Sequence, residues 1–61
     1  MQLMTCRETC QFFGGINSAT LYRGIKAGRY PRPVKVGPGS SRWLRGECEE
    51  ALARMIEGRA G

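Results

Sequence analysis

The chain has 61 residues, with 10 Lys and Arg, 5 Asp and Glu and no His, which gives a formal charge of +5. A chain of this size forms one domain over residues 1–61 and is too short to enclose a drug-sized pocket while keeping a core, so we expect no enzyme. No apolar run approaches the roughly 18 residues of a membrane span, and we expect no signal peptide. We therefore expect a small cytoplasmic domain that works by contact.

The first half of the sequence predicts two helices. Thr5 and Glu8 have the spacing of a capping box, which predicts a helix over residues 6–13 that stops at Gly14 and Gly15. Asn17 is a good N-cap for a second helix over residues 18–27. In this helix Leu21 and Ile25 share one face, beside Gly24. A helix, a short glycine-containing turn and a second helix outline a helix-turn-helix.

The second half predicts a hairpin and a third helix. Val34 to Val36 alternate apolar and polar as a half-buried strand does, residues 37–40 are turn formers, and residues 41–44 can return as a second strand. We expect Val34 and Trp43 in the core. A third helix begins near Gly46 or Glu47. We expect its apolar residues at helical spacing to face the core, and these are Cys48, Ala51, Leu52, Met55 and Ile56. The expected fold is α+β, mainly α: a winged helix-turn-helix with a two-stranded β-hairpin wing between helices two and three.

The positive charge is concentrated in the middle of the chain. Residues 18–45 contain no acid and carry Arg23, Lys26, Arg29, Arg32, Lys35, Arg42 and Arg45. A cationic surface of this kind attracts a polyanion, and double-stranded DNA is the partner we expect. The alternative is a solvated surface that only aids solubility.

The second helix has the residue order of a DNA recognition helix. Small residues at its start can enter the major groove, and the cations one turn later can reach phosphates or base edges. Arg23 is the best candidate for direct readout, because arginine can hold guanine through two parallel hydrogen bonds. The candidate DNA-binding residues of this helix are Ser18, Ala19, Thr20, Tyr22, Arg23 and Lys26. The alternative places Tyr22 at the rim of the core and the cations in solvent.

The hairpin over residues 34–44 is the second candidate contact. Lys35 and Arg42 flank a tip small enough to lie along a DNA backbone, and the hydroxyls of Ser40 and Ser41 can donate to phosphates. Taken alone, an ordinary polar turn explains this segment as well.

Catalytic and metal chemistry have no basis in the sequence. Cys6, Cys10 and Cys48 form no C-x-x-C pair, and without His they cannot complete a four-ligand zinc site. The odd number of cysteines argues against a disulfide framework. We expect small buried cysteines, no metal and no cofactor.

Four segments between Glu8 and Glu49 carry a family resemblance: Glu8-Thr9-Cys10, residues 14–17, residues 19–36 and residues 41–49. Together they resemble the AlpA family of small phage and prophage regulators. The resemblance implies a MerR-like winged fold shared with phage excisionases, whose second helix reads the major groove while the wing touches flanking DNA. It transfers the DNA contacts to Ser18, Ala19, Tyr22, Arg23, Lys26, Lys35 and Arg42. The sequence departs from the family pattern by one extra residue at Gly14-Gly15 and by Gly46 in place of a serine cap.

The family resemblance leaves two roles open, a transcriptional regulator and an excisionase-like recombination directionality factor. The candidate further partners are an integrase or recombinase, RNA polymerase, and other copies of the chain on DNA. The expected location is cytoplasmic and nucleoid-associated, for a protein of a prokaryote or a phage. A function of a different class is an adaptor that contacts an acidic protein through residues 18–45. An RNA-binding module is less consistent with the sequence, which lacks an aromatic platform for unstacked bases.

Overall fold

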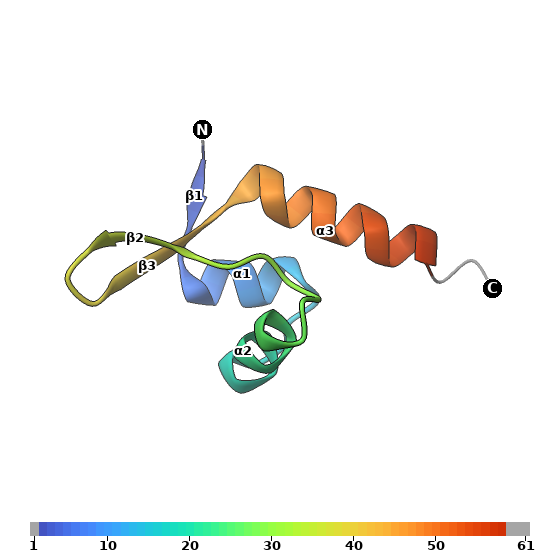
Figure 1. Cartoon of the computed structure of the whole chain (residues 1–61), viewed down its shortest axis with the longest axis horizontal. Helices are drawn as coiled ribbons and strands as arrows, with labels where there is room; N and C mark the ends of the chain where they lie inside the picture. Colours follow the sequence, from blue (N-terminus) through green and yellow to red (C-terminus); the bar gives the residue numbers. More distant parts are fainter. Residues whose placement is uncertain (1, 59–61) are drawn as a thin grey trace.

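The computed structural model describes residues 2–58 and contains three helices and three short strands (Figure 1). In chain order these are β1 (Leu3–Met4), α1 (Cys6–Phe12), α2 (Ser18–Lys26), β2 (Val34–Gly37), β3 (Ser40–Leu44) and α3 (Arg45–Gly58). The hairpin of β2 and β3 lies between the second and third helices, so the predicted class is confirmed: α+β, mainly α, with an arrangement compatible with a winged helix-turn-helix.

The two predicted N-caps begin α1 and α2. The hydroxyl of Thr5 accepts from the Glu8 amide at 3.1 Å, and the Glu8 carboxylate accepts from the Thr5 amide at 2.8 Å. These reciprocal bonds satisfy amides that a helix start leaves free. The side chain of Asn17 accepts from the Thr20 amide at 2.8 Å and begins α2 in the same way.

The sheet contains one strand that the sequence pattern did not predict. The strand order is β1-β3-β2, with both pairings antiparallel, and Met4 lies opposite Trp43. β1 has only two residues, which is too few to show an alternating pattern. Its pairing turns the expected two-stranded hairpin into a three-stranded sheet with β3 at the centre.

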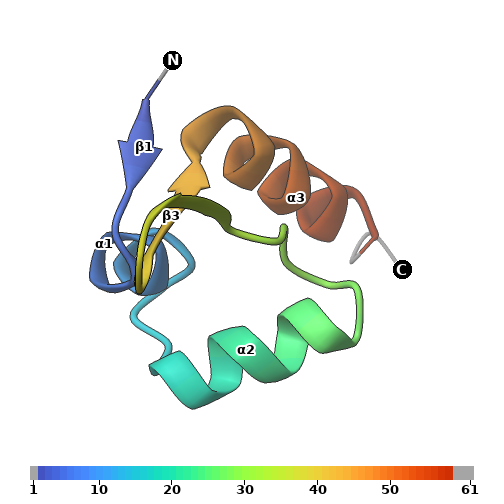
Figure 2. The same ribbon diagram turned by 60° about the vertical axis from the view of Figure 1, so that its left-hand side comes forward.

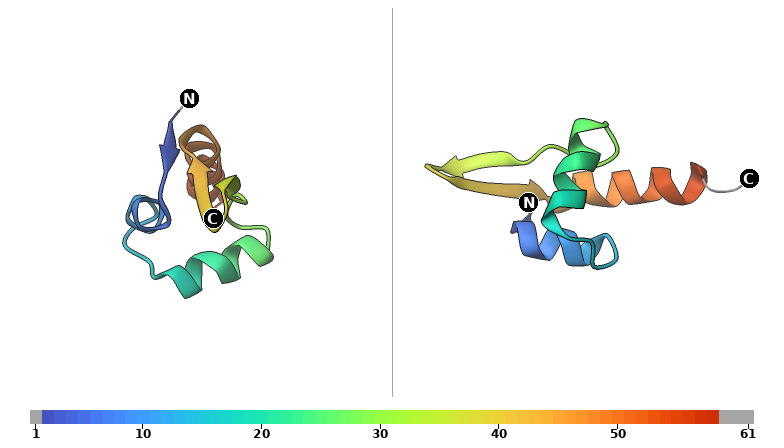
Figure 3. Two further views of the ribbon diagram at one scale, coloured as in Figure 1. Left: turned by 90° about the vertical axis from the view of Figure 1, so that its left-hand side faces the viewer. Right: turned by 90° about the horizontal axis from the view of Figure 1, so that it is seen from below.

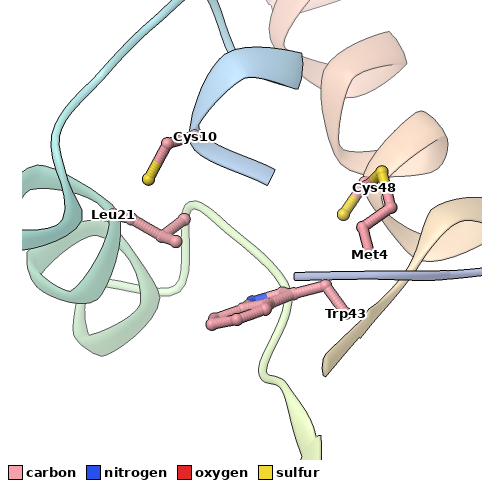
Figure 4. Packing of buried hydrophobic residues seen from close by; sticks show 5 residues of the cluster. All are labelled: Met4, Cys10, Leu21, Trp43 and Cys48. Atoms are coloured by element: carbon pink, nitrogen blue, oxygen red, sulfur yellow. The ribbon is translucent and has the colours of Figure 1, made fainter. Parts of the chain in front are cut away.

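The core lies where the two helices of the helix-turn-helix meet the base of the sheet. Met4, Cys10, Leu21, Trp43 and Cys48 come from five different elements and point into one interior (Figure 4). Trp43 and Leu21 are fully buried and are the two largest side chains in that state. In a domain this small, one buried tryptophan contributes a large share of the apolar area removed from water.

Three expectations about individual residues were wrong. Val34 is 37% exposed, because it lies opposite Arg42 on the outer face of the hairpin. The third helix begins at Arg45, directly after β3, so Gly46 lies within its first turn. Ile56 is 58% exposed, because the far half of α3 extends away from the rest of the molecule (Figure 1).

The arrangement leaves α2 and the hairpin, which we call the wing (residues 34–44), at the surface. Seen from below, α2 lies in front, the wing extends to one side and α3 to the other (Figure 3). Figure 2 shows α2 along one edge of the molecule, joined to α1 and to the wing by its two flanking turns. Both elements can therefore be approached from outside.

Candidate nucleic-acid interface

The inner face of α2 fixes which of its residues point outward. Leu21 is fully buried, Gly24 is buried and Ile25 packs against the core. With about 100° of rotation per residue, the opposite face belongs to Ala19, Arg23 and Lys26, and all three are exposed. The predicted recognition face is therefore presented to solvent as a small residue followed by two cations.

Gly24 allows the helix to pack closely against the segment that follows it. A Cβ atom at Gly24 would overlap the ring of Tyr30, and that ring packs in turn on Phe13 with centroids 4.6 Å apart. Any larger residue at position 24 would push Tyr30 away. The absence of a side chain at Gly24 therefore allows α2 and the segment after it to lie close together.

The end of α2 turns the chain back along the helix. Gly28 has φ of +82°, and the amide of Arg29 donates to the carbonyl of Gly24 at 2.7 Å. A left-handed glycine with these backbone bonds is a common way to close a helix. The turn brings Arg29 beside Arg23, and the two line one hollow of about 220 Å³ together with Thr20, Gly24 and Ala27. Arg29 was not among the predicted site residues; the glycine at position 28, directly after the predicted second helix, is the sequence signal that could have indicated this turn.

The flank of α2 nearer the wing carries Tyr22. Its ring lies 6.0 Å from that of Trp43 in an edge-to-face arrangement, yet Tyr22 remains 49% exposed. The indole N–H of Trp43 donates to the carbonyl of Pro31 at 3.0 Å. Tyr22 is therefore both a rim residue of the core, as the alternative interpretation held, and a side chain with a free edge at the surface.

The strand register divides the predicted wing residues between two faces. Lys35 lies opposite Ser41, whereas Arg42 lies opposite Val34. Since side chains alternate along β3, Lys35 and Ser41 share the face of Trp43, and Arg42 lies on the other face. The guanidinium of Arg42 donates to the Ser41 carbonyl at 2.9 Å, and Ser40 lies beside the tip, opposite Gly37. The structure thus places Lys35, and not Arg42, on the side of the wing that Tyr22 contacts.

One cation of the basic segment points elsewhere. Arg45 makes the single salt bridge found among residues 2–58, with its Nε 3.2 Å from Oε2 of Glu49, and it lies over the ring of Phe12. It also lines a hollow of about 550 Å³ that is formed by β1 and α1 and includes no residue of α2 or the wing. The charge available near α2 and the wing therefore comes from Arg23, Lys26, Arg29, Arg32, Lys35 and Arg42.

The cysteines behave as small core residues. Cys10 and Cys48 are buried and Cys6 is partly buried, all three as free thiols. Burial raises the pKa of the Cys10 thiol, and the neighbouring Cys6 raises it further. Burial is also the main cause of the raised pKa of Cys48. Within the described part of the chain, no three His, Cys, Asp or Glu residues are placed to hold a metal ion.

The fold and this surface define a class of protein, a small basic helix-turn-helix domain with a hairpin beside its second helix. Residues 2–56 match the family described as Prophage CP4-57 regulatory protein (AlpA). Because the match covers most of the chain, the chain belongs to the AlpA family of prophage regulatory proteins, a DNA-binding family. No curated protein and no solved structure matches the chain. Over residues 2–58, no helix is long and apolar enough to cross a membrane.

Proposed function

We propose that this chain binds double-stranded DNA in a sequence-specific manner, with α2 in the major groove and the wing on the flanking backbone. The observation that carries the proposal is the outward face of α2, where Ala19, Arg23 and Lys26 are exposed opposite the buried Leu21. Residues 9–46 contain no carboxylate that would repel a phosphate. The major groove, about 12 Å wide, admits an α-helix and displays a distinct pattern for each base pair.

The DNA contacts divide between the two elements. The start of α2 meets base edges, its later cations and Tyr22 reach the backbone, and the wing adds phosphate contacts beyond the groove. The residues proposed to contact DNA are Ser18, Ala19, Thr20, Tyr22, Arg23, Lys26, Lys35, Ser40, Ser41 and Arg42. The mechanism requires no catalytic group: the charge brings the domain to DNA, and side chains in the groove select the site.

Salt dependence of binding tests the proposal. A preferred sequence is first selected from a labelled pool of random duplexes. Fluorescence anisotropy then measures the affinity of the chain for the random pool and for the selected duplex at several salt concentrations. If about five to seven phosphates are neutralised, log K falls against log salt with a slope of roughly −4.5 to −6. A slope near −1, or equal affinity for selected and random duplexes, would contradict sequence-specific DNA binding. Salt-resistant binding to an acidic protein without any DNA binding would instead identify the adaptor.

Two regulatory roles are compatible with this binding mode. Membership of a prophage regulatory family supports control of transcription. An excisionase-like factor would in addition bend the DNA for a recombinase. The two roles differ in DNA geometry. A circular-permutation gel assay on the selected site measures bending, and binding of several copies to tandem sites measures cooperativity. Strong bending with cooperative loading favours the recombination factor, whereas an unbent single site favours the regulator.

A further inference from the structure

We infer that the hollow between Arg23 and Arg29 is a binding site for one phosphate of the DNA backbone, on the side of α2 away from the wing. The inference rests on the proposed DNA binding and assigns it a further residue, Arg29. It also pairs Arg23 with Arg29 on one phosphate, whereas the sequence alone favoured Arg23 for reading a base. The hollow measures about 220 Å³ and is lined by Thr20, Arg23, Gly24, Ala27 and Arg29.

The chemistry of the lining selects an anion. Two of the residues that line the hollow are arginines, and none is acidic. Neither Arg23 nor Arg29 forms a side-chain hydrogen bond or a salt bridge within residues 2–58. The other lining residues are Thr20, which carries a hydroxyl, and the small residues Gly24 and Ala27. Guanidinium groups and a hydroxyl around one small space suit a phosphate, which accepts several charge-assisted hydrogen bonds at once.

The position of the hollow identifies the backbone as the source of that phosphate. Around the helix, Thr20 and Ala27 lie on one flank of the outward face, and Tyr22 lies on the other flank beside Trp43 at the base of the wing. A helix in the major groove has a sugar-phosphate strand on each side. If the wing follows one strand, the hollow faces the other, so α2 is held between two lines of phosphate contacts.

The backbone geometry explains how Arg29 reaches this place. Arg29 follows α2, and it returns along the helix because Gly28 adopts a left-handed conformation and the Arg29 amide bonds to Gly24. These are main-chain features that an alanine at position 29 preserves. Substituting Arg29 therefore removes the charge without removing the turn, which makes it a clean probe.

The test compares Arg29→Ala with Arg54→Ala, which removes an equal charge from an exposed position on α3. Arg29→Ala should weaken binding roughly 10- to 100-fold, the range for a lost hydrogen bond to a charged group, and by the same factor on selected and random duplexes. Arg54→Ala should bind like the unsubstituted chain. Far-UV circular dichroism melting checks that both variants are folded.

A double variant tests whether the two arginines share one phosphate. Arg23→Ala combined with Arg29→Ala should lose less affinity than the two single losses multiplied together, and should lower the salt slope by about 0.9, the value for one phosphate. Replacing single phosphates of the selected duplex with neutral methylphosphonates should reveal one position that weakens the unsubstituted chain but not the double variant.

Several results would overturn the inference while leaving DNA binding in place. One is a steep salt slope of the unsubstituted chain together with equal DNA affinities of Arg29→Ala and Arg54→Ala. The others are affinity losses that multiply independently in the double variant, and loss of base preference on Arg23→Ala. If the hollow binds free phosphate and not the DNA backbone, the chain should bind DNA more weakly in phosphate than in chloride at equal ionic strength. In that case no methylphosphonate substitution should change the affinity. Absence of duplex binding by the unsubstituted chain would instead contradict the proposed function itself.

Discussion

The rings of Tyr22 and Trp43 meet edge to face, with their centroids 6.0 Å apart, and join the exposed flank of α2 to the base of the wing. Trp43 is fully buried and its indole N–H also donates to the carbonyl of Pro31 at 3.0 Å. The side chain of Trp43 therefore contacts α2 and the segment that leads into β2, and the main chain of Trp43 pairs with β1. The placement of α2 relative to the wing depends on this indole.

Replacing Trp43 with phenylalanine should destabilise the domain by about 1–3 kcal/mol. The smaller ring leaves a cavity, and the Pro31 carbonyl loses its donor. Urea unfolding followed by far-UV circular dichroism measures the change. Ile56→Ala is the control, because that side chain is 58% exposed and its loss should change stability by no more than about 0.5 kcal/mol. Equal effects of the two substitutions would show that Trp43 does not organise the core.

Tyr22 should respond differently to two substitutions. Tyr22→Phe keeps the ring on Trp43 and removes the hydroxyl, so stability should change by less than about 0.5 kcal/mol. If the hydroxyl donates to a phosphate, DNA binding should weaken about 10- to 100-fold, the range for a lost hydrogen bond to a charged group. Tyr22→Ala should lower both stability and affinity. Unchanged DNA affinity of Tyr22→Phe would reduce Tyr22 to a rim residue of the core.

The two cations of the wing should contribute unequally to DNA binding. Lys35 shares the face of Trp43, whereas Arg42 lies on the opposite face and its guanidinium bonds to the Ser41 carbonyl. Lys35→Ala should therefore weaken DNA binding more than Arg42→Ala, although both remove one charge. Anisotropy titrations at one salt concentration compare them. A larger loss for Arg42→Ala would mean that the outer face of the wing meets DNA.

Two glycine-to-alanine substitutions in helices should have effects of opposite sign. At Gly24 a Cβ overlaps the Tyr30 ring, so Gly24→Ala should destabilise the domain by about 1–3 kcal/mol even though alanine favours helix. At Gly46, in the first turn of α3, nothing lies within 4 Å of the added atom. Gly46→Ala should stabilise the domain by up to about 1 kcal/mol. Thermal melting of both variants distinguishes them, and a shift of the same sign would contradict the close approach of Tyr30.

Stability should fall in alkaline solution because of the buried thiols. Burial raises the pKa of Cys10 and of Cys48 in the folded state, so the unfolded chain loses these protons first as the pH rises. The folded state therefore binds more protons in this window, and the free energy of unfolding decreases with pH. The stability that the buried thiols contribute is fully present below the ordinary cysteine pKa of about 8.5, and it is lost as the pH rises through the raised pKa values of the folded state.

Urea unfolding between neutral pH and pH about 10.5 measures the fall in stability, which should be smaller in a Cys10→Ala, Cys48→Ala double variant. A fall of equal size in both proteins would assign it to other groups.

Local features of the chain determined the helices and the hairpin. The capping box of Thr5 and Glu8 and the Asn17 cap act over three residues, and the structure contains both. The buried positions of Leu21, Gly24 and Trp43 followed from helical spacing and from size. The basic character of residues 18–45 is a property of composition and needs no coordinates.

The tertiary structure decided which of these residues share a surface. The pairing of Leu3 and Met4 with β3, the exposure of Val34 and the position of Arg45 over the ring of Phe12 all depend on contacts that local pattern does not encode. Strand register separated Lys35 from Arg42, and a left-handed glycine brought Arg29 back beside Arg23. The sequence alone thus determined the elements and the sign of the charge, because caps, periodicity and composition act locally. Only folding decided the faces, because register and side-chain packing join residues that are distant in the chain.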